Sequence, residues 1–285
     1  MLQQTQVKTA TPYFKNFIKK YPTQKKLSEA SEDQILALWS GLGFYRRARN
    51  IFKTKEIIKE KYNNRFPKEF HQLLELPGIG KSTAGAIMSL AYENPHPILD
   101  GNVKRVITRL VNKNIDLLKE SQLWDLSSQF VNKENCFAYT QGIMDLGATV
   151  CTPTNPSCKD CPVQNQCMSA FNIINNKKRN VAQLKKVIPM NLSLIQTEDS
   201  LLLVKNEASS IWKNLWIPFE SRSLESYTNN FKLTSSQKIQ HELTHRRLNI
   251  KLNTYISTNG ILPIILEDEK IKELSEYAKR KEEIS

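Results

Sequence analysis

The sequence lacks any apolar run near the roughly 20 residues that a membrane-spanning helix needs, so we predict no membrane span. Its first segment, MLQQTQVKTATPYF, lacks the basic and apolar stretches of a secretory signal peptide. Acidic residues are scarce: 28 Asp and Glu stand against 41 Lys and Arg, giving a net charge of +13 and a pI of about 9.4. We therefore expect a cytoplasmic protein with a polyanionic partner, nucleic acid before an anionic membrane surface.

Cysteine is also rare, but four of the five cysteines fall in one short run with the spacing C-x6-C-x2-C-x5-C: Cys151, Cys158, Cys161 and Cys167. Four thiolates from one loop suit zinc or an iron–sulfur cluster, because both accept tetrahedral sulfur coordination. Disulfides or unrelated buried thiols are the plainer alternatives, and a reducing cytosol disfavours disulfides. Cys136 stands apart and is expected to be an inert, packed thiol.

The first part of the chain, residues 1–172, is predicted to be helical. Ser31 to Gln34 reads SEDQ, which is a capping box, and apolar residues follow it at helical spacing. Further stripes of helical period are most simply core faces, and they lie at 70–74, 84–91 and 103–110.

The composition changes after this region. Residues 173–187 are polar and basic, as a linker would be. Within 188–285, apolar alternation predicts strands in 192–206 and 248–257, and a charged helix closes the chain at 267–284. We therefore predict a small α+β second domain.

Leu76-Pro77-Gly78-Ile79-Gly80 lies between two helical stripes. Its glycines permit a tight turn and a close approach to a ligand. The turn opens onto a helix that is predicted to begin near Lys81, where free N–H groups and the helix dipole form an anion site. This pattern is typical of a helix-hairpin-helix that binds the DNA backbone without reading sequence. An ordinary turn between helices is the alternative.

Asp100 stands in PILDGNVKRVITRL, directly before an amphipathic stripe. It is therefore predicted to cap the N-terminus of a helix. The helix dipole favours the ionised carboxylate there. A fixed anion would also stabilise an oxocarbenium ion during N-glycosidic cleavage, and both roles can hold together.

Several segments, taken in order, resemble the A/G-specific adenine DNA glycosylases of the endonuclease III superfamily: MLQQTQV, GLGFYRRARN, LPGIGKSTAGAI, ILDGNVKRV, MDLGATVC and the cysteine run. The resemblance covers nearly the whole chain. It implies a mainly α helix-hairpin-helix domain with a 4Fe–4S cluster loop at 151–167. It also implies a Nudix-like domain that checks for 8-oxoguanine.

The resemblance implies roles for single residues. Asp100 matches the aspartate that stabilises the oxocarbenium ion, and Gln4, beside Gln3, matches a glutamine that inserts next to 8-oxoguanine. Phe44 stands where the family usually has a tyrosine wedge, so a hydroxyl contact is lost. Ser82 replaces the Schiff-base lysine of the lyases, which predicts a glycosylase without strong lyase chemistry. The expected DNA-binding set includes Gln3, Gln4, Phe44, Leu76, Pro77, Gly78, Gly80, Lys81 and Ser82, with Thr244 and His245 in the second domain.

In the second domain, Leu243-Thr244-His245 resembles the family's Phe-Ser-His loop, which senses 8-oxoguanine. Threonine keeps the hydroxyl, whereas leucine replaces the aromatic ring. A Nudix box is absent from the sequence. We therefore expect this domain to bind without hydrolysing nucleoside diphosphates.

The family's general acid is a glutamate two positions before the methionine of MLQQTQ, which here is Met1. The printed chain is therefore expected to be inactive, and a form extended upstream is expected to be active. A misplaced start explains this pattern better than a degenerate or binding-only relative.

The predicted function is base excision repair: hydrolysis of the N-glycosidic bond of adenine opposite 8-oxoguanine or guanine in double-stranded DNA, by a monomer. An endonuclease III-like glycosylase/lyase and a non-catalytic mispair-binding protein are the alternatives. A zinc-binding transcription factor would leave LPGIG and ILDGNVKR unexplained.

Overall fold

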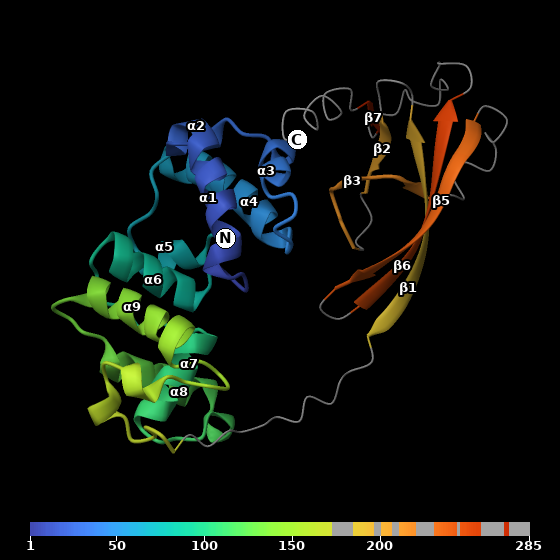
Figure 1. The fold of residues 1–285 in the computed structure, drawn as a ribbon. Helices are drawn as coiled ribbons and strands as arrows, with labels where there is room; N and C mark the ends of the chain where they lie inside the picture. The colour runs from blue at the N-terminus through green and yellow to red at the C-terminus, as the bar shows by residue number, and fades with distance from the viewer. Residues whose placement is uncertain are drawn as a thin grey trace. The chain divides into compact units, whose positions relative to one another are not determined.

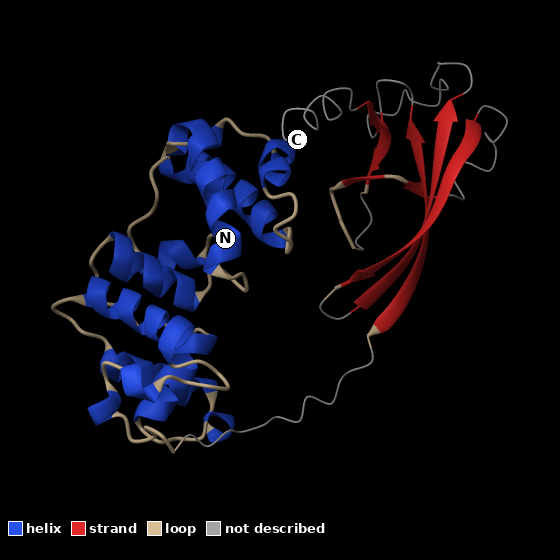
Figure 2. Cartoon of the chain, in the orientation of Figure 1, coloured by secondary structure: helices blue, strands red, loops and turns tan. Residues whose placement is uncertain are grey.

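The computed structural model describes residues 1–172, 185–196, 201–206, 211–220, 231–243, 246–257 and 271–273. The chain divides into two compact units, Met1–Lys178 and Arg179–Ser285. The described residues of the first unit are helical, and those of the second form a sheet (Figure 2). Throughout this described part, every helix is too short or too polar to cross a bilayer. Most of the expected linker at 173–187 lies outside the described residues, although a strand begins within it, at Lys186.

The helical unit confirms the predicted helical character of the N-terminal part. Figure 1 shows its elements, which are α1 (Val7–Lys20), α2 (Gln24–Ser28), α3 (Glu32–Leu38), α4 (Arg46–Tyr62), α5 (Phe70–Leu74), α6 (Lys81–Ala91), α7 (Gly101–Leu110), α8 (Glu120–Phe130) and α9 (Cys136–Asp145). Short 3-10 or π turns accompany them at Ile115–Leu117, Leu146–Val150, Cys158–Asp160 and Gln164–Gln166.

Helices α1 to α4 pack on one another at the start of the chain. The capping box is confirmed: Ser31 Oγ accepts from the Gln34 N–H at 3.2 Å, and Gln34 Oε1 accepts from the Ser31 N–H at 3.1 Å. Two residues of the predicted stripe, Ile35 and Trp39, are fully buried. The capping box and the burial of apolar residues at helical spacing thus both stabilise α3.

A second group of helices follows around two apolar clusters. One cluster joins α4, α5 and α6 through five buried residues: Ile58, Leu73, Leu76, Ala84 and Met88. The other joins α7, α8 and α9, with Val103, Ile107, Leu123 and Ile143 among its buried members. Leu74 was expected on a core face but is 42% exposed. The five-residue α5 turns only one narrow face inward, and Leu73 occupies it.

The described part of the second unit is a sheet of order β3-β2-β1-β6-β5, in which β4 also pairs with β1 and β7 with β2. Strands β1 and β6 are parallel, and the other pairs are antiparallel. The strands are β1 (Lys186–Gln196), β2 (Leu201–Lys205), β3 (Trp216–Ile217), β4 (Phe219–Glu220), β5 (Phe231–Glu242), β6 (Arg246–Ser257) and β7 (Ile271–Glu273). The predicted alternation is confirmed at the start of β6, where Leu248 and Ile250 are buried while Asn249 and Lys251 are exposed, but residues 252–255 are all half-buried.

The predicted closing helix at 267–284 is wrong where the structure describes it. Residues 271–273 form β7, which pairs antiparallel with β2. Pairing with an existing strand outweighs a helical propensity that is weak per residue. The other residues of that predicted helix lie outside the described part of the chain.

Candidate functional site

Two side chains of α4 contact the predicted hairpin. Leu76 is 2% exposed and anchors the turn in the core. Gly78 has a φ of 84°, and an added Cβ would lie 2.7 Å from Asn50 Nδ2. The Thr54 hydroxyl donates to the carbonyl oxygen of Pro77 at 3.0 Å. Glycine is therefore required at position 78 by both backbone conformation and space.

The hairpin opens onto α6, as predicted. Gly80 is the N-cap residue, no side chain caps the helix, and its first turn carries no acidic residue. The first N–H groups of α6 thus keep their capacity to bind an anion. The ammonium of Lys81 lies 4.1 Å from the centre of the Trp124 ring, in a cation–π contact that directs it toward α8.

Asp100 is held close to the hairpin helix by its neighbour in sequence. The N–H of Leu99 donates to the Ser82 hydroxyl at 2.9 Å. Asp100 Oδ1 then accepts from the Val103 N–H at 2.8 Å, which confirms the predicted N-cap of α7. The carboxylate is exposed to solvent at this helix start. One short segment therefore connects the carboxylate to the hairpin.

Arg105 received no role from the sequence, yet it joins the start of α7 to the cysteine run. Its Nε donates to the carbonyl oxygen of Cys151 at 2.8 Å, and its Nη2 donates to Gly147 O at 2.6 Å and to Asn102 Oδ1 at 2.9 Å. Burial lowers the pKa of the Arg105 guanidinium. Only its place in GNVKR, one turn after Asp100, could have signalled this connection.

The N-terminal segment reaches the same region. Gln3 Nε2 donates to the carbonyl oxygen of Gly78 at 3.3 Å and to the Thr83 hydroxyl at 3.4 Å. Gln4 is exposed, with a φ of 57°. Phe44 is 48% exposed, with a φ of 50°. The structure thus brings Gln3 to the hairpin, and it leaves Gln4 and Phe44 accessible.

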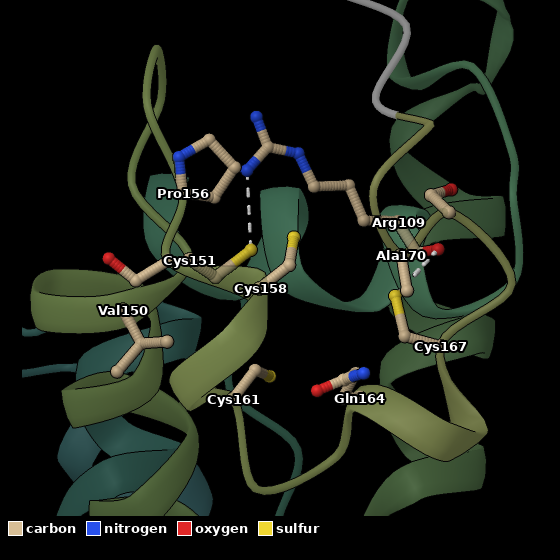
Figure 3. Close-up of a pocket in the computed structure, with 11 residues that line it drawn as sticks. Arg109, Val150, Cys151, Pro156, Cys158, Cys161, Gln164, Cys167 and Ala170 are labelled. Carbon is tan, nitrogen blue, oxygen red and sulfur yellow. Dashed lines mark hydrogen bonds between the residues drawn. The ribbon is translucent and has the colours of Figure 1, made fainter.

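The cysteine run forms a second centre. Figure 3 shows Cys151, Cys158, Cys161 and Cys167 around one cavity, which Arg109 also lines. Arg109 Nη1 donates to Cys151 Sγ at 3.2 Å, and the thiol of Cys167 donates to the Arg109 carbonyl oxygen at 3.6 Å. Burial raises the pKa of the Cys167 thiol, and the three neighbouring cysteines raise it further. Arg109 therefore supplies positive charge where four thiolates would repel one another.

The remaining predicted residues have simpler places. Cys136 is 3% exposed and donates to the Ser89 carbonyl oxygen at 3.7 Å, so the expectation of a packed thiol is confirmed. Leu243 packs partly buried against the apolar face of the sheet. Thr244 and His245 lie outside the described residues.

Comparisons with known proteins agree with this geometry. The family model of the HhH-GPD superfamily base excision DNA repair proteins matches residues 1–123. The adenine DNA glycosylase of Buchnera aphidicola subsp. Schizaphis graminum is 40% identical over 273 residues, which cover 93% of this chain and 78% of that protein.

Two solved structures are similar to the helical part. A thermostable thymine-DNA glycosylase aligns with a TM-score of 0.55 at 26% identity, over 60% of this chain and 81% of its own. A trapped endonuclease III–DNA covalent intermediate gives a TM-score of 0.52 at 25% identity, over 59% and 79% of the two chains. Sequence identity over most of both proteins, together with this shared helical fold, shows that the chain belongs to the adenine DNA glycosylase family.

Proposed function

We propose that the chain hydrolyses the N-glycosidic bond of adenine mispaired with 8-oxoguanine or guanine in duplex DNA. One observation carries this proposal: Asp100 caps the N-terminus of α7, and the preceding residue, Leu99, is hydrogen-bonded to Ser82 in the first turn of α6. A hairpin that binds a phosphate would therefore set the position of the carboxylate relative to the bound strand. Membership of the family and the net charge of +13 support DNA as the substrate.

The chemistry follows from this arrangement. The N–H groups at the start of α6 bind a backbone phosphate, and the target adenine leaves the base stack. As the bond between C1′ and the base nitrogen breaks, the Asp100 anion stabilises the developing positive charge on the sugar. Water adds to C1′, and adenine departs with a proton on its ring. In the family, that proton comes from the glutamate two positions before the methionine of MLQQTQ.

A lyase reaction is less well supported. It requires an amine at the position of Ser82, where a hydroxyl already accepts the Leu99 N–H. The adjacent amine, Lys81, lies over the Trp124 ring. We therefore propose hydrolysis without strand cleavage.

The four cysteines are proposed to hold a 4Fe–4S cluster. All four thiols line one cavity. Within the described ranges, no three His, Cys, Asp or Glu side chains are placed to hold a single metal ion. Four cysteine thiolates around one cavity are a donor set that a 4Fe–4S cluster can use, and their spacing resembles the cluster loop of the family. When bound, it would supply structural cross-linking of the loop. Iron, sulfide and zinc analysis of the purified protein distinguishes the two metals.

The second unit is proposed to be a Nudix-like domain that binds 8-oxoguanine. The alignment with the Buchnera protein covers 93% of this chain and so includes this unit. Strand β5 ends at Glu242 and β6 begins at Arg246, so Leu243-Thr244-His245 connects them. Binding to A:8-oxoguanine and A:T duplexes, compared before and after His245→Ala, tests this role.

Single-turnover excision on an A:8-oxoguanine duplex tests the main proposal. We expect adenine to be released from this duplex faster than from an A:T duplex when the assayed polypeptide carries a glutamate two positions before the methionine of MLQQTQ. Asp100→Asn is the matched variant, because asparagine preserves the helix cap while removing the charge. It should bind DNA normally and lose at least about 10²-fold in rate.

Two results would contradict the proposal. Tight mispair binding without excision by any form would indicate a binding protein. Strand cleavage without added alkali would indicate a lyase.

A further inference from the structure

One guanidinium, that of Arg47 in the first turn of α4, connects two segments that are far apart in the sequence. Its Nη1 donates to the carbonyl oxygen of Gln3 at 2.7 Å and to that of Met1. Its Nη2 donates to the carbonyl oxygen of Gly43 at 3.1 Å. The N-terminal segment and the 41–45 turn are therefore bonded to the same side chain.

The carbonyl groups at positions 3 and 43 are significant because each directly precedes a residue with unusual backbone geometry. Gln4 and Phe44 have φ values of 57° and 50°, in the left-handed region that non-glycine residues rarely adopt. The φ angle of a residue sets the orientation of the peptide plane before it. Holding the carbonyl oxygens of Gln3 and Gly43 therefore opposes the relaxation of both strained residues.

Aromatic contacts add to this arrangement. The guanidinium carbon of Arg47 lies 5.3 Å from the centre of the Trp39 ring and 5.4 Å from that of Phe44. Trp39 is fully buried, and its Nε1 donates to the same Gly43 carbonyl oxygen at 3.0 Å. The fixed Trp39 ring thus supports the guanidinium, which in turn contacts the exposed Phe44 ring.

The charge of Arg47 is directed at the backbone. Among the described residues no carboxylate forms an ion pair with it, and its hydrogen bonds to those residues go to main-chain carbonyls. Its Nε is buried without a hydrogen-bond partner, and burial lowers its pKa. Such a costly placement is typical of a group that fixes a local geometry.

We propose that Arg47 is a positioning residue that holds Gln4 and Phe44 together as one rigid unit for probing the DNA duplex. This inference rests on the proposed function, since it requires both residues to meet DNA. The planar guanidinium of arginine can bind three carbonyl groups and contact two rings at once, which the point charge of lysine cannot.

The test is the fluorescence of 2-aminopurine placed opposite 8-oxoguanine in a duplex, which rises when the base leaves the stack and requires no catalysis. We expect Arg47→Lys to lower the fluorescence per bound complex roughly tenfold, because a small displacement of positioning groups has large effects. Arg46→Gln is the control, because Arg46 is exposed on the same helical turn. It should weaken binding in a salt-dependent way and leave the fluorescence per bound complex unchanged.

A second readout remains valid if the variant is less stable. Hydrogen exchange in the folded protein should increase together at the amides of Thr5 and Leu42, which donate to Leu2 O at 3.2 Å and Trp39 O at 3.0 Å. A double-mutant cycle of Arg47→Lys with Phe44→Ala should be non-additive in fluorescence.

The outcomes separate the two proposals. If the Arg47→Lys variant gave the same fluorescence per bound complex as the wild type, or if the two amides exchanged independently, the role of Arg47 alone would be overturned. No fluorescence change with the wild-type protein would overturn duplex probing itself, and this inference with it.

Discussion

Replacing Gly78 with alanine tests the geometry of the hairpin. The backbone there has a φ of 84°, and the new Cβ would lie 2.7 Å from Asn50 Nδ2 and 2.9 Å from Asn50 Cβ. The left-handed conformation costs an L-residue about 1–2 kcal/mol, and crowding in a packed region costs about 1–3 kcal/mol. Because Asn50 belongs to α4, either the hairpin or the helix must move. We expect the free energy of unfolding to fall by about 2–5 kcal/mol in total.

Gly80→Ala is the matched control. No atom lies within 4 Å of its Cβ position, and its φ of −87° suits any residue. We expect a change in unfolding free energy of less than about 1 kcal/mol. Urea denaturation of both variants measures the difference, and equal midpoints and slopes would refute the reasoning. Titration with duplex DNA should also show weaker binding for Gly78→Ala, because its hairpin amides are displaced from the phosphate.

Three further predictions concern packing and pH. Gly147→Ala should lower the melting temperature, because its Cβ would lie 2.7 Å from that of Asn102, whereas Gly142→Ala meets no atom within 4 Å and should not. Burial raises the pKa of Tyr139 from 10.0 to about 12. The unfolded chain therefore loses the phenolic proton from about pH 10, whereas the folded protein keeps it until about pH 12. The free energy of unfolding should fall across this window in the wild type and fall less in Tyr139→Phe, and denaturation at a series of pH values measures the difference. Ser82→Ala removes the acceptor of the 2.9 Å hydrogen bond from the Leu99 N–H, and it should lower the free energy of unfolding by about 1–3 kcal/mol in chemical denaturation. Ser128→Ala, at an exposed position, is the control.

Local signals in the sequence predicted much of the helical unit. A capping box acts over three residues, so Ser31 and Gln34 could be paired from the sequence. The N-cap at Asp100 and the left-handed backbone at Gly78 also depend on a few neighbouring residues, whereas the crowding of Gly78 by Asn50 is a tertiary contact. The partners in these local interactions are close in the sequence, which is why the sequence predicted them.

The sheet was predicted only where one face is apolar. Leu248 and Ile250 alternate with polar residues in β6, and this period was visible in the sequence. Strand β5 pairs with β6 along its length, yet most of its residues are exposed and polar. An edge strand with little buried surface carries almost no alternation signal, so only pairing could reveal it.

By itself, the sequence determined the family-specific motifs: the cysteine spacing, the hairpin and the carboxylate that follows it. The tertiary structure decided how these motifs are joined. Arg105 bonds the start of α7 to Cys151, 46 residues away, and Arg47 bonds the segment at Gln3 to the turn at Gly43. Both arginines lie in segments that resemble the family, GLGFYRRARN and ILDGNVKRV, but the sequence does not identify the groups that they bind. Their partners are backbone carbonyls, which every residue carries, so only the folded chain selects which ones they bind.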